Sequence, residues 1–205
     1  LGVADPPAPT VWLGPTHEAA AERLVPPGGP VLAVGPAANW IGKQWRAARF
    51  AELVRRLTAR EGVLAGARVA VFAAGHERPQ AAPVLEALPA GQAIDLIGGI
   101  DLPTAAACLR RCAFFVGNDS GLMHLAAAAG TPTLGLFGPS PERRYRPWGA
   151  KAAYVRTPES VADLRAAPPN AGPVTETLMD GLSVDLVVEA AAALWRRAGG
   201  PRLPA

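Results

Sequence analysis

Short apolar runs of strand length recur along the chain, and Gly, Pro or polar residues bound each of them. The runs occupy residues 31–35, 68–73, 93–97, 113–117 and 133–137, and a weaker sixth run occupies residues 152–155. Apolar runs of four to eight residues are typical of strands that are covered on both faces of a parallel sheet. The pattern therefore predicts about six buried strands.

Segments with apolar residues at helical spacing separate these runs. Helices are predicted at residues 17–24 with Thr16 as the cap, from Phe50 to Leu57, and at residues 79–88, 102–111, 125–130 and 184–197 with Ser183 as the cap. On the second of these helices, Glu52 and Arg56 are spaced as an i,i+4 ion pair. Alternating strands and helices predict right-handed βαβ units. The expected fold class is α/β, with a Rossmann-like parallel sheet of about six strands and helices on both faces.

A polar turn, Asn118–Gly121, leads from the fourth apolar run into a helix. Asp119 or Ser120 can cap that helix. Unpaired N–H groups and the helix dipole at such a turn attract a phosphate, and Gly121, which lacks a Cβ, lets an anion approach the backbone. His124 shares a helix face with Ser120 and Gly121, so these polar groups converge. The alternative is that Asp119 only caps the helix and that His124 only hydrogen-bonds to a neighbour.

Lys43 follows the first apolar run, at the end where open α/β sheets bind ligands. Its point charge on a flexible stem suits a phosphate oxygen. The alternative is an exposed lysine beside a packed Trp45. A second strand-end candidate is Glu77, whose carboxylate could accept hydrogen bonds from two vicinal hydroxyls.

Length and composition indicate one well-packed domain. We expect residues 1–30 to form an interdomain linker and lead-in helix and residues 31–205 to form the domain that binds the ligand. The sequence has no run of eighteen or more uncharged apolar residues, which predicts that no segment spans a membrane. Cys108 and Cys112 are four residues apart, which fits neither a redox pair nor a zinc pattern, and they are expected in the core of a protein from a reducing compartment.

The net charge of +3 comes almost wholly from arginine, because Lys43 and Lys151 are the only lysines. This charge fits a diphosphate ligand or an anionic membrane surface, but equally a solvated exterior. Residues 142–148 are basic and aromatic and follow the fifth run, where a diphosphate, an acidic acceptor or only solvent could face them. No basic and aromatic surface long enough for nucleic acid is evident, so no nucleic-acid partner is expected.

The stretch Asn118–Ala128, followed by Gly130–Pro132 and Leu136–Gly138, closely resembles the signature of glycosyltransferase family 9, the ADP-heptose:lipopolysaccharide heptosyltransferases and their relatives. Lys43-Gln44-Trp45 resembles the family's Lys-x-Trp segment. The resemblance covers residues 10–197 but only the second half of a usual family member. It implies the C-terminal, donor-binding half of a GT-B fold.

The resemblance also implies roles for individual residues. It implies that Lys43, Asp119 and His124 are the catalytic residues and contact the donor's diphosphate and sugar. It also implies that the donor is bound by these three residues together with Asn39, Glu77, Ser120 and Gly121, and that Glu77 contacts the nucleotide ribose. Ala38 and Asn39 stand where some heptosyltransferases have threonines just before this lysine.

For activity, the resemblance implies inverting transfer of a sugar, by default heptose from ADP-heptose, to a lipopolysaccharide-type or other glycan acceptor, with no metal or cofactor. The general-base carboxylate would lie on an N-terminal domain absent from this chain, and a start at Leu1 rather than Met agrees with a missing segment. The alternatives are a non-catalytic domain that binds a nucleotide or a partner, and a sugar-nucleotide epimerase-like enzyme of the same architecture.

The expected partners are a nucleotide sugar, a glycan or glycolipid acceptor and the N-terminal domain. The resemblance places the enzyme in the cytoplasm, with peripheral contact to the cytoplasmic face of the inner membrane as a further expectation. In the family the closing helix packs near the other half of the enzyme. The apolar stripe on residues 184–197 therefore predicts an exposed apolar patch around Trp195.

Overall fold

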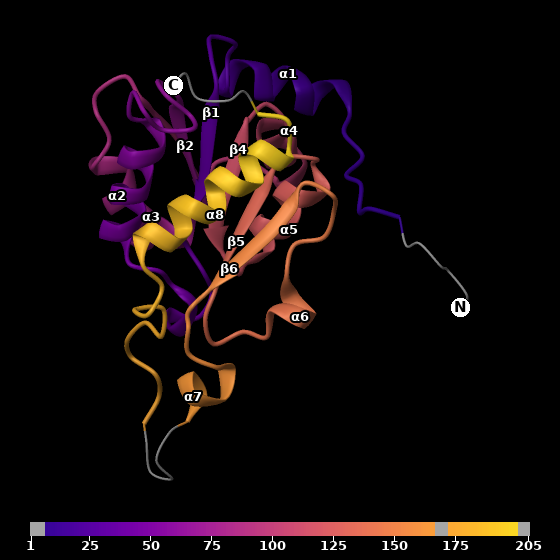
Figure 1. Cartoon of the computed structure of the whole chain (residues 1–205). Coiled ribbons are helices and arrows are strands. Elements are labelled where there is room, and N and C mark those ends of the chain that lie inside the picture. Colours follow the sequence, from indigo (N-terminus) through magenta and orange to yellow (C-terminus); the bar gives the residue numbers. More distant parts are fainter. Residues whose placement is uncertain (1–6, 167–171, 201–205) are drawn as a thin grey trace.

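A computed structural model describes residues 7–166 and 172–200, which form one twisted sheet between two layers of helices (Figure 1). The five strand pairings are all parallel, which confirms the α/β class. The elements in chain order are α1 (Pro15–Leu24), β1 (Val31–Gly35), η1 (Ile41–Lys43), α2 (Ala47–Thr58), β2 (Arg68–Ala73), η2 (Gly75–Glu77), α3 (Arg78–Glu86), β3 (Ala93–Ile97), α4 (Leu102–Arg110), β4 (Phe114–Asn118), α5 (Gly121–Ala128), β5 (Thr133–Phe137), α6 (Glu142–Tyr145), β6 (Ala152–Arg156), α7 (Val161–Arg165) and α8 (Val184–Arg197).

The strand order is β3-β2-β1-β4-β5-β6, so the first strand lies in the centre of the sheet. The chain winds outward from β1 to β3 and then returns to place β4 on the other side of β1, with Leu32 beside Phe114. In doubly wound sheets, ligands bind in the crevice where the order reverses, at the carboxyl ends of the strands. The loops after β1 and β4 therefore flank the expected crevice.

Each face of the sheet has its own apolar core, because alternate residues of a strand point to opposite sides. Leu32 and Val34 belong to the core beneath α2, α3 and α8, whereas Val31 and Ala33 belong to the core beneath α1, α4 and α5. Full burial of one large apolar side chain contributes about 1.5–3 kcal/mol. Among the largest buried side chains of the two cores are Trp45, Phe50, Phe72, Phe114, Phe115 and Phe137.

Most element boundaries agree with the sequence pattern. The strands β1, β2, β3 and β5 begin and end at the predicted residues. The fourth strand extends to Asn118, which still pairs with Leu136 of β5. One predicted helix start is wrong, because helix α1 begins at Pro15 with Gly14 as its N-cap rather than Thr16. Helix α5 begins at Gly121 with Ser120 as its N-cap, as the polar turn predicted.

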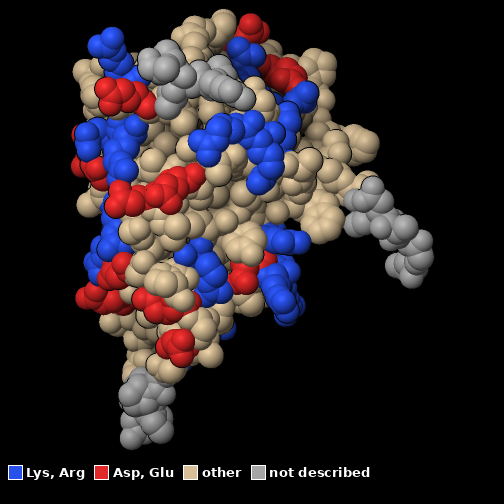
Figure 2. Space-filling view, in the orientation of Figure 1, with Lys and Arg blue, Asp and Glu red and all other residues tan. Residues whose placement is uncertain are grey.

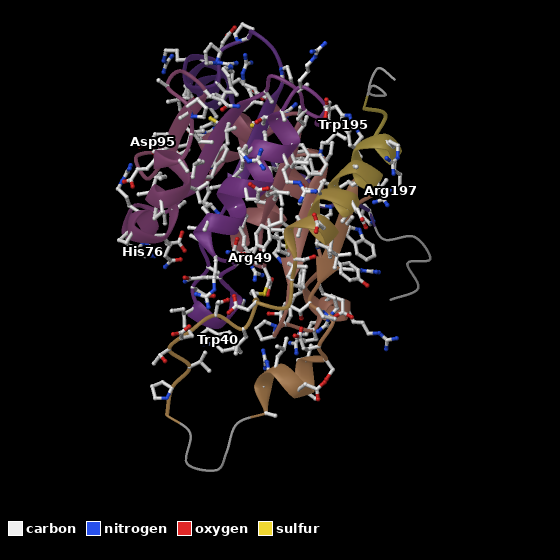
Figure 3. All side chains as sticks on the ribbon, turned by 60° about the vertical axis from the view of Figure 1, so that its left-hand side comes forward. Trp40, Arg49, His76, Asp95, Trp195 and Arg197 are labelled. Carbon is white, nitrogen blue, oxygen red and sulfur yellow. The ribbon has the colours of Figure 1, made fainter. Side chains whose placement is uncertain are left out.

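Two predicted side-chain arrangements are also wrong. Glu52 pairs with Arg55, one residue closer than the predicted Arg56, while Arg56 pairs with Asp185 on α8. Trp195 does not form an exposed patch. Its side chain is buried on the inner side of α8, 6.3 Å from the ring of Phe114 (Figure 3).

The two cysteines lie in the core, as predicted, and neither forms a disulfide. Burial raises the pKa of the Cys112 thiol to about 12 and that of Cys108 to about 11. Both therefore remain protonated thiols near neutral pH. They act as small apolar side chains between α4 and the sheet.

Candidate functional site

Lys43 and Asp119 meet at the reversal of strand order, although 76 positions separate them in the sequence. The Lys43 Nζ atom lies 3.1 Å from Asp119 Oδ2 and donates a hydrogen bond to the Asp119 carbonyl oxygen at 3.4 Å. The Asp119 side chain is 7% exposed and that of Lys43 is 23% exposed. The lysine therefore still has access to solvent, whereas the carboxylate is enclosed.

Asn118 fixes the loop that carries Lys43 to the end of β4. Its Nδ2 donates to the Pro36 carbonyl at 2.7 Å, and its Oδ1 accepts from the Trp45 backbone N–H at 3.1 Å. The Trp45 indole N–H in turn donates to the Leu182 carbonyl at 2.9 Å. Since Asn118 and Trp45 are both buried, these bonds hold both ends of the loop in place.

A segment just before α8 crosses the same loop and holds the backbone on either side of Lys43. The Leu178 N–H donates to the Gly42 carbonyl at 3.1 Å, and the Thr177 hydroxyl donates to the Gln44 carbonyl at 2.5 Å. The guanidinium group of Arg165, on α7, lies 5.8 Å from the centre of the Trp40 ring, which Figure 3 labels in the lower half of the view. The lysine is therefore presented by a fixed loop.

The first turn of α5 is not capped by a side chain. Ser120 is the N-cap residue, but its hydroxyl accepts no hydrogen bond from the helix. By contrast, Asp101, Ser160 and Ser183 each cap their helices through a side-chain oxygen. The first N–H groups of a helix have no partner within the helix, so those at the start of α5 remain available to a ligand.

Gly121 opens the space in front of these N–H groups. Its φ is not in the left-handed region, and a Cβ built on it would meet no atom within 4 Å. Neither backbone conformation nor packing therefore requires glycine at this position. What the missing Cβ provides is close access to the backbone from outside.

Asp119 does not cap α5, so the alternative that it serves only as a cap is wrong. Its buried Oδ2 atom lies 3.1 Å from Lys43 Nζ but accepts no well-aligned hydrogen bond. The ion pair with Lys43 is the dominant interaction of this oxygen, because Coulomb attraction does not require alignment. The oxygen nevertheless retains capacity to accept a hydrogen bond.

A pocket of about 380 Å³ adjoins the start of α5 and brings Glu77, Ser120 and Gly121 together. Its floor is apolar, with side chains from the ends of β2 and β3 and from the first turn of α5: Phe72, Leu96, Ile100 and Leu122. The Glu77 Oε2 atom accepts from the Ala74 N–H at 2.9 Å, which leaves Oε1 for another partner. Asp101, on the same wall, has its pKa held below its usual value, mainly by the hydrogen bonds from Thr104.

Two other predicted residues, His124 and Asn39, lie at the margins of this arrangement, as does His76. His124 is exposed and lines a neighbouring hollow of about 350 Å³ together with Gly121 and Trp148. Asn39 is exposed at the bend before η1, and His76 is exposed on η2 (Figure 3). Lys43 does not line the 380 Å³ pocket; its ammonium group lies against Asp119, the residue before the N-cap of α5.

Asn118, Thr177 and the Leu182 carbonyl support the lysine loop and were not predicted from the sequence. The only sequence signal for this support was the amide side chain of Asn118 at the end of an apolar run, where a buried amide must form hydrogen bonds. Within residues 7–166 and 172–200, no group of three or more His, Cys, Asp or Glu side chains is placed to hold a metal ion. No helix of the same residues is long and apolar enough to cross a membrane.

Comparisons with known proteins agree on one family. The model of glycosyltransferase family 9 (heptosyltransferase) matches residues 4–170. Lipooligosaccharide heptosyltransferase 2 of Haemophilus influenzae is 31% identical over 131 residues, which are 62% of this chain and 36% of that protein. Lipopolysaccharide heptosyltransferase 2 of Escherichia coli K12 gives the same identity and the same coverage.

Solved structures share the fold at lower identity. ADP-heptose lipopolysaccharide heptosyltransferase II of E. coli superposes with a TM-score of 0.72 at 24% identity, over 93% of this chain and 54% of that structure. The E. coli heptosyltransferase WaaC with ADP gives a TM-score of 0.65 at 20% identity, over 95% of this chain and 52% of that structure. This chain therefore spans about half the length of the structures that it matches.

Proposed function

Because the chain belongs to glycosyltransferase family 9, we propose that it is the donor-binding half of an inverting glycosyltransferase. The proposed donor is ADP-heptose, and the proposed acceptor is a glycan of the lipopolysaccharide type. Relatives whose names state heptosyl transfer support the choice of sugar, and the relative solved with ADP supports the choice of nucleotide. The general base would be a carboxylate from outside this chain.

The observation that carries the proposal is the uncapped start of α5, which directly follows the residue that Lys43 contacts, Asp119. A diphosphate placed there would accept hydrogen bonds from the first N–H groups of the helix and would meet the ammonium group of Lys43. Gly121 leaves the approach open. The enclosed carboxylate of Asp119 already compensates Lys43, so it directs the lysine and is itself turned away from solvent.

The pocket beside α5 suits the nucleoside. Its apolar floor would cover the faces of a nucleobase, and its volume is of the size that a small ligand needs. Glu77 lies on its wall, with one oxygen fixed by Ala74 and the other free for ribose hydroxyls. Base, ribose and diphosphate would therefore follow one another from the end of β2 to the start of α5.

The same groups would assist the reaction. As the bond between the sugar and the diphosphate breaks, negative charge grows on the leaving phosphate oxygens, and the helix N–H groups and Lys43 would stabilise it. This stabilisation is greater in the transition state than in the bound donor, and it therefore accelerates transfer. His124, one turn into α5, would contact the sugar side of the donor.

Calorimetric titration of the chain with ADP, UDP and GDP tests the proposal, and we expect ADP to bind most tightly. Lys43→Met should weaken ADP binding about 10- to 100-fold, because hydrogen bonds to charged groups are worth about 1.5–3 kcal/mol. Lys151→Met is the matched control, since it removes the only other lysine from an exposed turn. Absence of binding to all three nucleotides would instead favour a partner-binding module, and equal losses in both variants would exclude a phosphate contact for Lys43.

A further inference from the structure

A cationic and aromatic surface follows the carboxyl end of β5 and is not used by the proposed donor site. It consists of Arg143, Arg144, Tyr145, Arg146 and Trp148, and we call it the α6 surface. All five side chains are exposed. In Figure 2, basic side chains protrude over the position that α6 occupies in Figure 1.

The arginines of the α6 surface differ from half of the other arginines that the structure describes. Seven arginines elsewhere are paired with carboxylates: Arg46, Arg49, Arg55, Arg56, Arg78, Arg110 and Arg156. Within residues 7–166 and 172–200, Arg143, Arg144 and Arg146 form no salt bridge. In that part of the chain, the guanidinium group of Arg144 lies 5.4 Å from the centre of the Tyr145 ring. Three uncompensated positive charges therefore lie within four residues.

The scaffold beneath these arginines is fixed. Arg156 pairs with Glu142 at 2.6 Å, with side chains only 25% and 19% exposed. Arg156 also donates to the carbonyls of Gly138 and Glu159, at 3.2 and 2.8 Å. Pro147 is buried between Arg146 and Trp148. The three unpaired arginines are thus held on an anchored segment, which lowers the entropy lost when they bind a ligand.

The α6 surface is continuous with the proposed donor site. Trp148 lines the hollow of about 350 Å³ that also contains Gly121 and His124. On its other side, Trp148 lines a larger hollow of about 780 Å³ together with Arg146, Tyr154 and Arg197. A molecule bound along Trp148 would therefore reach from the sugar end of the donor to Arg146.

We propose that the α6 surface binds a phosphorylated sugar residue of the acceptor, an inference that rests on the proposed function. Arginine binds phosphate through paired N–H groups, and the faces of Trp148 and Tyr145 offer apolar area to a sugar ring. The donor's own diphosphate has a separate site at the start of α5 and Lys43. A lipid bilayer fits less well, because α6 has only four residues and presents no long amphipathic face.

The test uses the chain saturated with ADP and titrated with mannose 6-phosphate, with mannose and inorganic phosphate as comparison ligands. The variant Arg143→Gln/Arg144→Gln/Arg146→Gln removes the three charges. Its matched control is Arg23→Gln/Arg60→Gln/Arg196→Gln, which removes three exposed arginines that also form no salt bridge in the described part of the chain. We expect the first variant to bind mannose 6-phosphate about tenfold more weakly, since each exposed ion pair contributes about a factor of two. The control should bind it as the original chain does.

Two further measurements separate the possible explanations. Trp148→Ala should weaken mannose 6-phosphate binding more than binding of inorganic phosphate, because only the sugar contacts the ring. Both triple variants should retain the ADP affinity of the original chain. A loss of ADP affinity confined to the α6 variant would assign its arginines to the donor and overturn the inference.

Equal binding of mannose 6-phosphate by the two triple variants would also overturn the inference and leave the proposed function intact. Failure of the original chain to bind any nucleotide would overturn the proposed function itself. Binding of vesicles that contain anionic lipid, lost in the α6 variant while mannose 6-phosphate does not bind at all, would assign the surface to a membrane instead and refute the acceptor site.

Discussion

Replacing Lys43 by methionine should destabilise the fold as well as weaken nucleotide binding. The substitution leaves the Asp119 carboxylate, 7% exposed, without the ammonium group that lies 3.1 Å away. Removing one partner of a fully buried ion pair costs about 3–5 kcal/mol, whereas exposed pairs are worth about 0.2–1 kcal/mol. Because Lys43 is 23% exposed, we expect an intermediate loss of about 2 kcal/mol in the free energy of unfolding. For a chain of this size the loss corresponds to a decrease of about 4–8 °C in Tm.

A double-mutant cycle with Asp119→Asn separates the two effects. Asparagine has nearly the shape of aspartate but no charge, so Lys43→Met/Asp119→Asn no longer buries an unpaired carboxylate. We expect the double variant to regain about 1–2 kcal/mol of unfolding free energy relative to Lys43→Met. Its ADP affinity should remain low, because the ammonium group is still absent.

Urea unfolding at neutral pH measures the stability of each variant in the cycle, and calorimetric titration with ADP measures its nucleotide affinity. Lys151→Met serves as the control in both. If Lys43→Met unfolds at the same urea concentration as the original chain, the contact with Asp119 does not stabilise the fold. If Asp119→Asn fails to rescue the stability of Lys43→Met, an unpaired charge is not the cause of the loss.

Three further predictions follow from the geometry. Gly121→Ala should leave Tm unchanged or slightly raised, because the added Cβ meets only open space, but the same Cβ should weaken ADP binding. Gly130→Ala, at a φ of +84°, should lower the free energy of unfolding by about 1 kcal/mol without affecting ADP binding. Equal ADP affinities for both variants would contradict an anion site at α5. Asn118→Ala should lower the free energy of unfolding, measured in urea, by about 2–3 kcal/mol, because two buried hydrogen bonds are lost. A loss below about 0.5 kcal/mol would show that these hydrogen bonds do not hold the loop. Arg46 holds the pKa of Asp180 below its usual value. The original chain should therefore be more stable than Asp180→Asn by its full margin above about pH 4, and this margin should disappear as the pH falls through the lowered pKa. A margin that grows in acid would refute this assignment.

The sheet could be predicted from the sequence because its signal is local. Continuous apolar runs bounded by turn residues define β1 and β5 to the residue, since a strand covered on both faces admits few polar side chains. The start of α5 was predicted from its capping residues, because its first turn, Gly121 to His124, carries no clear apolar stripe. There the polar turn and the helix dipole, rather than periodicity, mark the beginning of the helix.

Side-chain partners across long sequence separations could not be predicted in the same way. Asp119 and Ser120 are both good capping residues, and only the fold shows that Lys43 draws the carboxylate of Asp119 elsewhere. Trp195 and Leu186 lie on the same predicted apolar stripe, yet Leu186 is 40% exposed and Trp195 is buried. Which edge of a wide stripe faces the core depends on the sheet and on α2, with which α8 packs.

The central place of β1 in the sheet bears on how the chain folds. Its neighbour β2 follows after one crossover, but its other neighbour, β4, lies about eighty positions further along, so this second pairing closes a much longer loop. Lys43 and the start of α5 come together only when β1 and β4 pair, so chains that have not formed this pairing would lack the proposed donor site. A nucleotide present during refolding should then slow unfolding of the finished sheet without speeding its assembly.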